Sequence, residues 1–375
     1  LSKPFISKSS QFSGSGYYFY DLNTKVNYEF NEKNKLYLSG YFGRDVFDFA
    51  NSRQSLKINI PWGNATGTIR WNHVFNKKLF ANTTGVFNDY RFTFNALQNN
   101  LQIKLSSGIQ DLSIKQDFDY YPSSSHKIKF GGIYTYHKFF PSVISGKQDS
   151  VTFDPLNAQT KFAREAGIYI QDDWNLNAKI QVNTGLRFGL FEQVGPNKIY
   201  TKDINGNRTD STVFTKGQQV KLYNGFEPRV SMRYTLNENT SIKASLSRNL
   251  QYIHLVSNSG STLPTDLWVP STYKVKPQIS WLYAAGLFKN FKNNTYETSF
   301  EVYYKQMQNQ IEYKDGYTPN TLDDTENSFV FGKGWSYGSE LFINKIKGRL
   351  TGWIGYTLSW TWRQFPDLNN GNKYP

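Results

Sequence analysis

A two-residue alternation of apolar and polar side chains over residues 17–44 constrains the fold of this chain most. Apolar side chains occupy every second position from Tyr18 to Phe30, interrupted by a threonine, and most positions between them are polar, as at Asn23. A period of two is the pattern of a β-strand with one apolar and one polar face. The polar residues 31–34 then provide a short turn, and a second alternating run follows. The stretch therefore predicts a β-hairpin.

The two runs are too long for an ordinary soluble sheet. Each is about twice the length of a usual strand of about 5–6 residues, and a tilted strand of about 9–11 residues crosses a bilayer. One face is too polar for the core of a β-sandwich, and the other is too continuously apolar for a surface in water. The hairpin is typical of two strands in an outer-membrane barrel.

The same pattern recurs to the end of the chain and predicts seven hairpins, hence fourteen strands. The tight turns are expected at residues 31–34, 76–78, 122–125, 175–177, 237–239, 292–294 and 345–348. Longer connections are expected at residues 45–62, 139–161, 193–225, 251–278 and 308–334. Alternating tight turns and long loops are typical of bacterial outer-membrane barrels, whose tight turns face the periplasm. We predict an all-β, transmembrane, antiparallel meander barrel that forms one domain over residues 1–375.

Composition agrees with a membrane barrel and excludes several other classes. Aromatic residues make up 17% of the 375 residues, with 26 Tyr, 29 Phe and 9 Trp, which favours aromatic girdles at the two bilayer interfaces. The absence of cysteine excludes thiol catalysis, thiolate metal sites and disulfides. The net charge of +14 is compatible with outer-membrane lipids and lipopolysaccharide as partners. The basic residues are spread singly, which argues against nucleic acid.

Motifs for catalysis are absent from the sequence. The glycine pair at residues 14–16 is not followed by a helical pattern, and residues 332–334 lack the spacing of a phosphate-binding loop. The adjacent carboxylates of Asp172 and Asp173 point to opposite faces of a strand. The histidines have no metal-ligand spacing; they are His73, His126, His137 and His254. We therefore predict no enzyme activity, no metal site and no cofactor.

Two groups of side chains are candidates for a transport site. Charged residues on the polar strand faces would point into the barrel lumen, where they line water or hold a plug domain; they are Arg187, Arg229, Arg233, Glu297, Glu301 and Glu340. Aromatic and histidine side chains in the long connections could stack on a ligand or pack as a lid; they are Tyr252, His254, Trp268 and Tyr313.

Several short motifs occur in an informative order along the chain. Residues 166–174 read AGIYIQDDW and are followed by TGLR at 184–187; FEPRVS at 226–231 precedes SLSR at 245–248; YGSEL at 337–341 precedes GWIGYTLS at 352–359. In this order and spacing the chain resembles the TonB-dependent transporter family, particularly the forms from Bacteroidetes-type bacteria.

The resemblance implies a 22-stranded barrel in the bacterial outer membrane, closed by a plug and energised by the TonB complex. It implies import of a scarce nutrient, such as a metal chelate, cobalamin or oligosaccharide, and leaves a surface lipoprotein open as a further partner. Because fourteen strands cannot close such a barrel, we expect an open, curved sheet and an internal piece of a longer protein, without plug or final strands. There are two alternatives. The first is a passive porin or channel, and the second is an outer-membrane structural or secretion component.

Overall fold

The computed structural model describes residues 7, 9–149, 151–153, 160–203, 208–256, 267–316 and 325–375. The strands are β1 (Gly16–Asn31), β2 (Asn34–Asn51), β3 (Leu56–Asn76), β4 (Leu79–Gln98), β5 (Leu101–Ser123), β6 (His126–Gln148), β7 (Val151–Phe153), β8 (Lys161–Asn175), β9 (Ile180–Val194), β10 (Asn197–Lys202), β11 (Arg208–Phe214), β12 (Gln219–Asn237), β13 (Thr240–Gln251), β14 (Ile253–Val256), β15 (Leu267–Pro270), β16 (Gln278–Phe291), β17 (Tyr296–Tyr313), β18 (Phe329–Lys345) and β19 (Gly352–Gln364). Short 3₁₀ turns are η2 (Ser52–Gln54), η3 (Thr325–Ser328) and η4 (Asn369–Gly371). No helix in these residues is long and apolar enough to cross a membrane.

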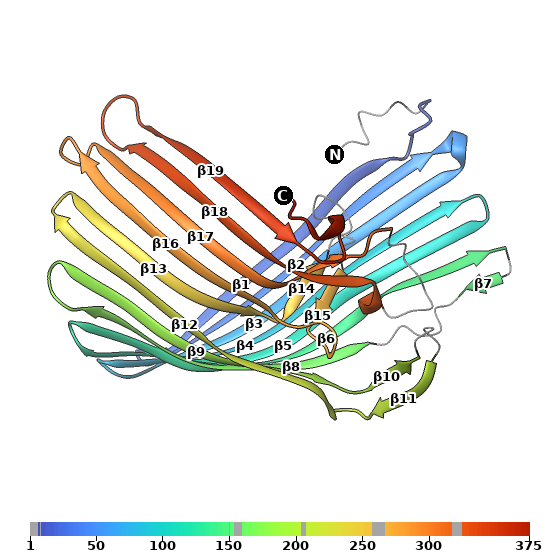
Figure 1. The fold of residues 1–375 in the computed structure, drawn as a ribbon, viewed down its shortest axis with the longest axis horizontal. Coiled ribbons are helices and arrows are strands. Elements are labelled where there is room, and N and C mark those ends of the chain that lie inside the picture. The colour runs from blue at the N-terminus through green and yellow to red at the C-terminus, as the bar shows by residue number, and fades with distance from the viewer. Residues whose placement is uncertain are drawn as a thin grey trace.

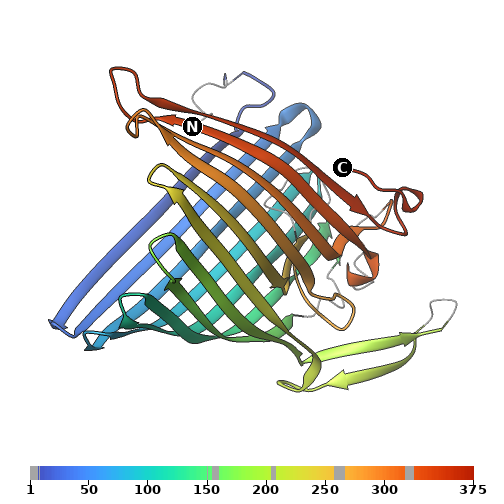
Figure 2. The same ribbon diagram turned by 60° about the vertical axis from the view of Figure 1, so that its left-hand side comes forward.

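Fourteen strands form one antiparallel meander in the order β1-β2-β3-β4-β5-β6-β8-β9-β12-β13-β16-β17-β18-β19. Short β7 adds to β6, and β10–β11 and β14–β15 form separate two-stranded sheets. The large sheet curls around an interior space (Figures 1 and 2). Within the described residues β1 and β19 do not pair with each other, so the sheet is open. The predicted antiparallel barrel meander, its strand number and its open, curved form are confirmed.

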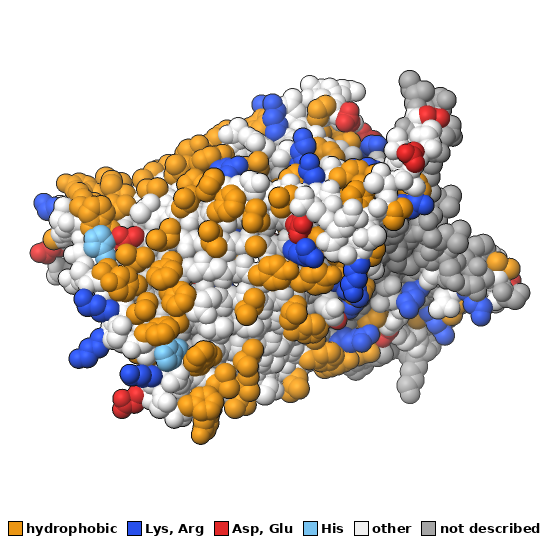
Figure 3. Space-filling view, turned by 90° about the horizontal axis from the view of Figure 1, so that it is seen from below, with side chains coloured by type: hydrophobic (Ala, Val, Ile, Leu, Met, Phe, Trp, Pro, Cys, Tyr) orange, Lys and Arg blue, Asp and Glu red, His pale blue; other side chains and the backbone are white. Residues whose placement is uncertain are grey.

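The two faces of the sheet differ as the alternation predicts. Leu22 and Val26 are 64% and 55% exposed on the convex face, which we call the outer face, and Val302 on β17 is also exposed there. Ile128 and Ile180 are half-buried between neighbouring side chains. Hydrophobic side chains spread over the middle of this face, with Lys and Arg toward its ends (Figure 3). A belt of apolar side chains facing outward is the surface that lipid covers.

Asparagine and serine side chains fix the tight turns at one end of the sheet. Backbone N–H groups two residues on donate to the side-chain oxygens of Asn31 (3.0 Å), Asn76 (2.8 Å), Ser123 (3.3 Å), Asn177 (2.9 Å) and Asn237 (3.0 Å). Such local bonds replace the missing ladder bonds of the turn. The same turn chemistry therefore sets the register of one hairpin after another.

The connections at the other end differ from the prediction. Most of residues 45–62 are strand, because β2 runs to Asn51 and β3 begins at Leu56. In 139–161, β6 continues to Gln148, and the connection 193–225 contains β10, β11 and the start of β12. Beyond the membrane a strand keeps its hydrogen-bond ladder but no longer needs an apolar outer face, so the sequence pattern fades before the strand ends.

Candidate functional site

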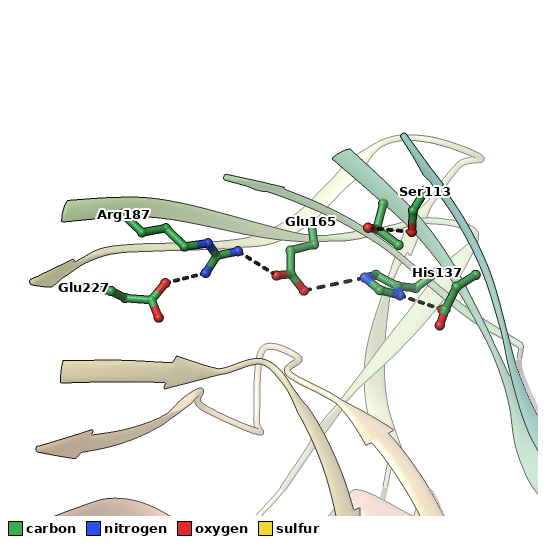
Figure 4. A network of polar contacts seen from close by, with 7 residues as sticks. Ser113, His137, Glu165, Arg187 and Glu227 are labelled. Atoms are coloured by element: carbon green, nitrogen blue, oxygen red, sulfur yellow. Dashed lines mark hydrogen bonds and ion pairs between the residues drawn. The ribbon is translucent and has the colours of Figure 1, made fainter. Parts of the chain in front are cut away.

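A chain of charged side chains crosses the concave, inner face of the sheet on β5, β6, β8, β9 and β12 (Figure 4). Nδ1 of His137 is 2.7 Å from Oδ1 of Asp111, and its Nε2 is 3.6 Å from Oε2 of Glu165. Nη2 of Arg187 is 3.1 Å from Oε1 of Glu165, and its Nη1 donates to Oε1 of Glu227. We call these five residues the charged network. Basic and acidic side chains alternate in it from strand to strand.

The strand register places these partners side by side. Asp111 lies directly opposite His137, and Arg187 lies directly opposite Glu227. His137 is 4% and Glu227 3% exposed. A buried charge is tolerated only when an opposite charge or several hydrogen bonds accompany it. Because each side chain of the network has a partner of opposite type beside it, this part of the wall can be buried under another segment.

The cover is the hairpin of β14 and β15, which lies inside the curved sheet (Figure 1). The ring of Tyr252, just before β14, stacks on Phe191 of β9 with centroids 5.0 Å apart and planes at 10°. Ile109, Phe139 and Ala163 complete this apolar cluster on the inner wall. The described parts of the connection between β13 and β16, residues 252–256 and 267–277, thus fold into the lumen and pack beside the charged network.

A buried carboxylate ties this hairpin to the rest of the molecule. Glu326, in the connection between β17 and β18, is 4% exposed. It accepts hydrogen bonds from Nζ of Lys161 at the start of β8 and from Oγ1 of Thr272, which lies 2.8 Å away, after β15. The hydroxyl of Tyr223 on β12 donates to the carbonyl oxygen of Thr272 over 2.7 Å. Two connections and two wall strands therefore meet at one point.

His254 on β14 is enclosed in the hairpin. Its side chain is 1% exposed, and its Nε2 is 3.1 Å from Oγ of Ser271. Among the described residues its Nδ1 has no hydrogen-bond partner. Burial lowers the pKa of His254 to about 4, because the enclosed imidazole loses solvation when it is charged. The ring is therefore neutral at pH 7.

The strand register places all six predicted charged residues on the inner face. Their contacts and their exposure differ from one residue to the next. Only Arg187 belongs to the charged network. Arg229 and Arg233 are exposed on β12. Glu301 of β17 and Glu340 of β18 lie directly opposite each other, and the remaining one, Glu297, accepts a hydrogen bond of 3.0 Å from Nδ2 of Asn344. Their part in holding a plug or lining a path stays a prediction.

The four predicted loop side chains are packed to different degrees. Tyr252 and His254 are buried in the hairpin. Trp268 is half-buried against the same apolar cluster as Tyr252. Tyr313 is half-buried and makes an edge-to-face contact of 5.2 Å with Phe329. This packing is what a lid would need, and contact with a ligand stays a prediction for all four.

Sequence reasoning missed most of the charged network. Asp111, His137, Glu165 and Glu227 all lie at inner positions of alternating strands, and that alternation is the signal that could have selected them. Which of them meet depends on the cross-strand register, which one sequence does not show. Across the described residues, no group of three His, Cys, Asp or Glu side chains is arranged to hold a metal ion.

Comparison with protein families decides where this architecture belongs. Residues 4–375 match the model of the family described as TonB dependent receptor-like, beta-barrel. The chain belongs to this family. Its members are barrels of the bacterial outer membrane, so the outer face described above is the lipid face, and the tight turns lie toward the periplasm. A search of curated protein sequences finds no significant match.

Solved structures of TonB-dependent transporters share the fold. The copper transporter OprC superposes with a TM-score of 0.66 at 13% identity, over 96% of this chain and 55% of that one. The ferric-catecholate import receptor Fiu from K12 E. coli superposes with a TM-score of 0.62 at 13% identity, over 96% of this chain and 60% of that one. The RagAB peptide transporter superposes with a TM-score of 0.57 at 10% identity, over 96% of this chain and 48% of that one. This chain spans about half the length of these structures, and identities this low establish the fold alone.

Proposed function

We propose that this chain forms a single partial-barrel domain in the wall of an outer-membrane transporter that imports a scarce nutrient with energy relayed through TonB. Membership of the TonB-dependent receptor family supports this proposal most directly. The wall makes and breaks no bond in this role. It encloses the path and holds the groups that open and close it.

The inward hairpin favours gated import over an open pore. Its Tyr252 and His254 are buried against the inner wall, and Glu326 joins it to β8. A passive porin requires a lumen that is open to water. A connection packed into the lumen instead narrows the path, and a gated transporter uses such a segment.

We expect the substrate to be a metal chelate, cobalamin or an oligosaccharide that binds among the extracellular connections and a plug domain inside the barrel. The TonB complex would act on that plug from the periplasm. A surface lipoprotein is a further proposed partner, and lipopolysaccharide and outer-membrane lipid would surround the outer face. The solved structures named above are a copper transporter, a ferric-catecholate import receptor and a peptide transporter, and this range does not select one substrate class for this chain.

Uptake by cells that express the full-length protein tests the proposal. Cells would be offered a labelled ferric chelate, labelled cobalamin and a labelled oligosaccharide, with and without TonB and with a protonophore. We expect accumulation of one of the three that is lost without TonB or proton-motive force. Accumulation that persists without TonB, together with steady ion conductance of the purified protein in planar bilayers, would indicate a porin. No accumulation and no conductance would favour a structural or secretion component.

A further inference from the structure

Basic side chains recur on the outer face at the extracellular end of its apolar belt (Figure 3). The strand register places one each on β2, β4, β6 and β8; they are Arg44, Arg91, Lys138 and Arg164. We call these four residues the basic band. Each lies between 10 and 12 residues from the turn end of its strand, and a tilted strand needs about 9–11 residues to cross a bilayer. The basic band therefore lies at the level of the outer-leaflet headgroups.

The side chains between the basic band and the tight turns are apolar on the same face. Phe42, Phe87 and Leu112 are exposed there, as expected of a surface that lipid tails cover. A basic side chain above such a surface can lay its aliphatic stem on the apolar side chains and extend its charge toward the headgroups. This behaviour accounts for a single cation at this level. A binding site requires cations that converge.

Two cations of the band converge on one aromatic ring. Cζ of Arg91 lies 3.3 Å and Nζ of Lys138 lies 4.7 Å from the ring centroid of Phe140, so the two charged groups are at most about 8 Å apart. Gly108 lies directly opposite both Arg91 and Phe140. A Cβ on this glycine would lie 2.6 Å from Cδ of Arg91. The glycine therefore allows the arginine side chain to lie across β5 and reach the ring.

The neighbouring carboxylate balances only one of these two charges. Oδ1 of Asp89 accepts a hydrogen bond of 2.6 Å from Nε of Arg91, and its Oδ2 accepts one of 3.2 Å from Nε2 of Gln110. Both oxygens are therefore engaged. Among the described residues Lys138 forms no ion pair. The two cations at Phe140 thus keep a net positive charge.

The two ends of the basic band differ. Arg164 pairs with Glu192 at 3.2 Å, which balances its charge. Arg44 is exposed and, in the part of the chain that the structure describes, has no ion pair. It lies in the same cross-strand row as Arg91, with Gly63 between them. Two strand spacings separate the two arginines by about 10 Å, and the glycine adds no side chain to the surface between them.

We propose that Arg44, Arg91 and Lys138 form a binding site for the phosphate groups of lipopolysaccharide in the outer leaflet. One phosphate lies between Arg91 and Lys138, where it accepts charge-assisted hydrogen bonds of about 2.7–2.9 Å on two sides. This contact relieves the repulsion between the two cations. A second phosphate on the same sugar headgroup contacts Arg44, and a ligand held at two points binds more tightly than one held at either point.

A phospholipid headgroup has a single phosphate and gains only one of these contacts. The site therefore distinguishes lipopolysaccharide from other anionic lipids. The proposal deepens the lipopolysaccharide partner named above and rests on the proposed function for its place in the outer membrane. It does not depend on which nutrient is imported.

Binding of lipid A, the phosphorylated anchor of lipopolysaccharide, to the purified full-length protein tests the site. Delipidated protein in detergent would be titrated with bisphosphorylated lipid A, with phosphatase-treated lipid A and with phosphatidylglycerol. Native mass spectrometry gives the fraction of protein that retains one lipid. We expect half-saturation by lipid A at a concentration at least about tenfold below that of the other two lipids, the effect of one or more charged contacts. Equal binding of lipid A and either of the other two would overturn the proposal.

Neutral variants locate the site on the outer face. Arg91→Gln with Lys138→Gln should weaken lipid A binding at least about tenfold, because both partners of one phosphate are lost. Arg44→Gln should remove most of the preference for lipid A over phosphatidylglycerol, since only one phosphate is then held. Lipid A binding that stays within about twofold of wild type in the double variant would overturn the proposal.

Two basic residues elsewhere on the outer face provide the matched control. Lys333 on β18 is exposed and lies 12 residues from the turn end of its strand, and Arg248 lies on β13. Arg248→Gln with Lys333→Gln removes the same charge as the double variant of the site and should leave lipid A binding within about twofold. An equal loss in both double variants would show attraction to overall charge and would overturn the proposal.

Heat-dependent migration of each purified protein in detergent would show that the barrel has folded, and only folded variants would be compared. Because lipid A binding is measured without transport, a failure to bind lipid A and a failure to import a nutrient are separate outcomes.

Discussion

At the scale of single residues, Arg187 shows why a guanidinium suits the centre of the charged network. Its planar group reaches Glu165 with one terminal nitrogen and Glu227 with the other. A lysine ammonium is a point charge and cannot match this forked geometry. The arginine therefore joins β8, β9 and β12 on the inner face, where the hairpin excludes water from Glu227.

Replacement of Arg187 by methionine should destabilise the full-length barrel by about 2 kcal/mol. The change leaves the carboxylate of Glu227 buried without its partner, which costs about 3–5 kcal/mol at a fully buried pair, and the partial exposure of Arg187 and Glu165 reduces this. Arg229→Met is the control, because Arg229 is exposed and has no ion pair among the described residues. Reversible unfolding by urea in lipid vesicles measures both. An equal decrease in the free energy of unfolding for both variants would show that the charged network contributes no stability.

Acidification should loosen the β14–β15 hairpin through His254. The pKa of His254 in the folded protein is about 4, below about 6.5 in an unfolded chain. Its contribution is therefore fully present above pH 6.5 and is lost as the pH falls toward 4, to a total of roughly 3 kcal/mol. Hydrogen exchange of hairpin amides at pH 7 and 5, corrected for intrinsic rates, should show about 20-fold more opening at pH 5. In His254→Gln the pH dependence should vanish; if it persists, another group is responsible.

The sequence was informative about single residues only in part. Alternation placed Arg187 on the polar face, and its partners Glu165 and Glu227 lie on neighbouring strands about 22 and 40 positions away. Register between strands depends on turn geometry and on bulges such as the one between Gln308 and Gln310, which no local pattern encodes. Single side chains could therefore be assigned to a face but not to partners.

At the scale of strands and turns, the hydrophobic pattern was sufficient to predict the strands and tight turns of the part of the sheet that faces lipid. The tight turns and the strands beside them agree with prediction, because each strand must turn apolar side chains toward the bilayer. Beyond the bilayer that requirement ends, so the extension of β6 to Gln148 and the separate hairpin β10–β11 carried no signal. The fold of the membrane part was predictable, and the fold of the extracellular part was not.

The two faces of β1 should respond oppositely to a new charge. Val26→Arg puts a guanidinium on the lipid face, where it costs about 2–4 kcal/mol near the bilayer midplane. Asn27→Arg adds charge to the inner face and should be tolerated. The yield of folded full-length protein in lipid vesicles measures both, and we expect a clear loss for Val26→Arg alone. Similar yields for the two variants would refute the assigned facing.

At the scale of the whole molecule, the inner surface is divided into two zones. Nearer the extracellular side, the charged network is neutralised within the wall and covered by the β14–β15 hairpin. Nearer the periplasmic turns, Arg233 lies directly opposite Lys243 and Glu301 lies directly opposite Glu340, so charges of the same sign are grouped there. At the extracellular level the charges of the wall are therefore neutralised and covered, whereas at the periplasmic level like charges lie side by side.

Removal of the inward hairpin therefore tests the gate directly. Replacement of residues 252–277 by a short Gly-Ser linker should abolish uptake and raise the ion conductance of the full-length protein, because the segment that narrows the lumen is gone. Barrel insertion should remain, since the large sheet pairs its strands without this hairpin. The control is the same replacement of residues 197–214, the β10–β11 hairpin that projects away from the wall (Figure 2). It should leave conductance unchanged. Unchanged uptake and conductance after loss of residues 252–277 would remove this connection from both the gate and the binding site.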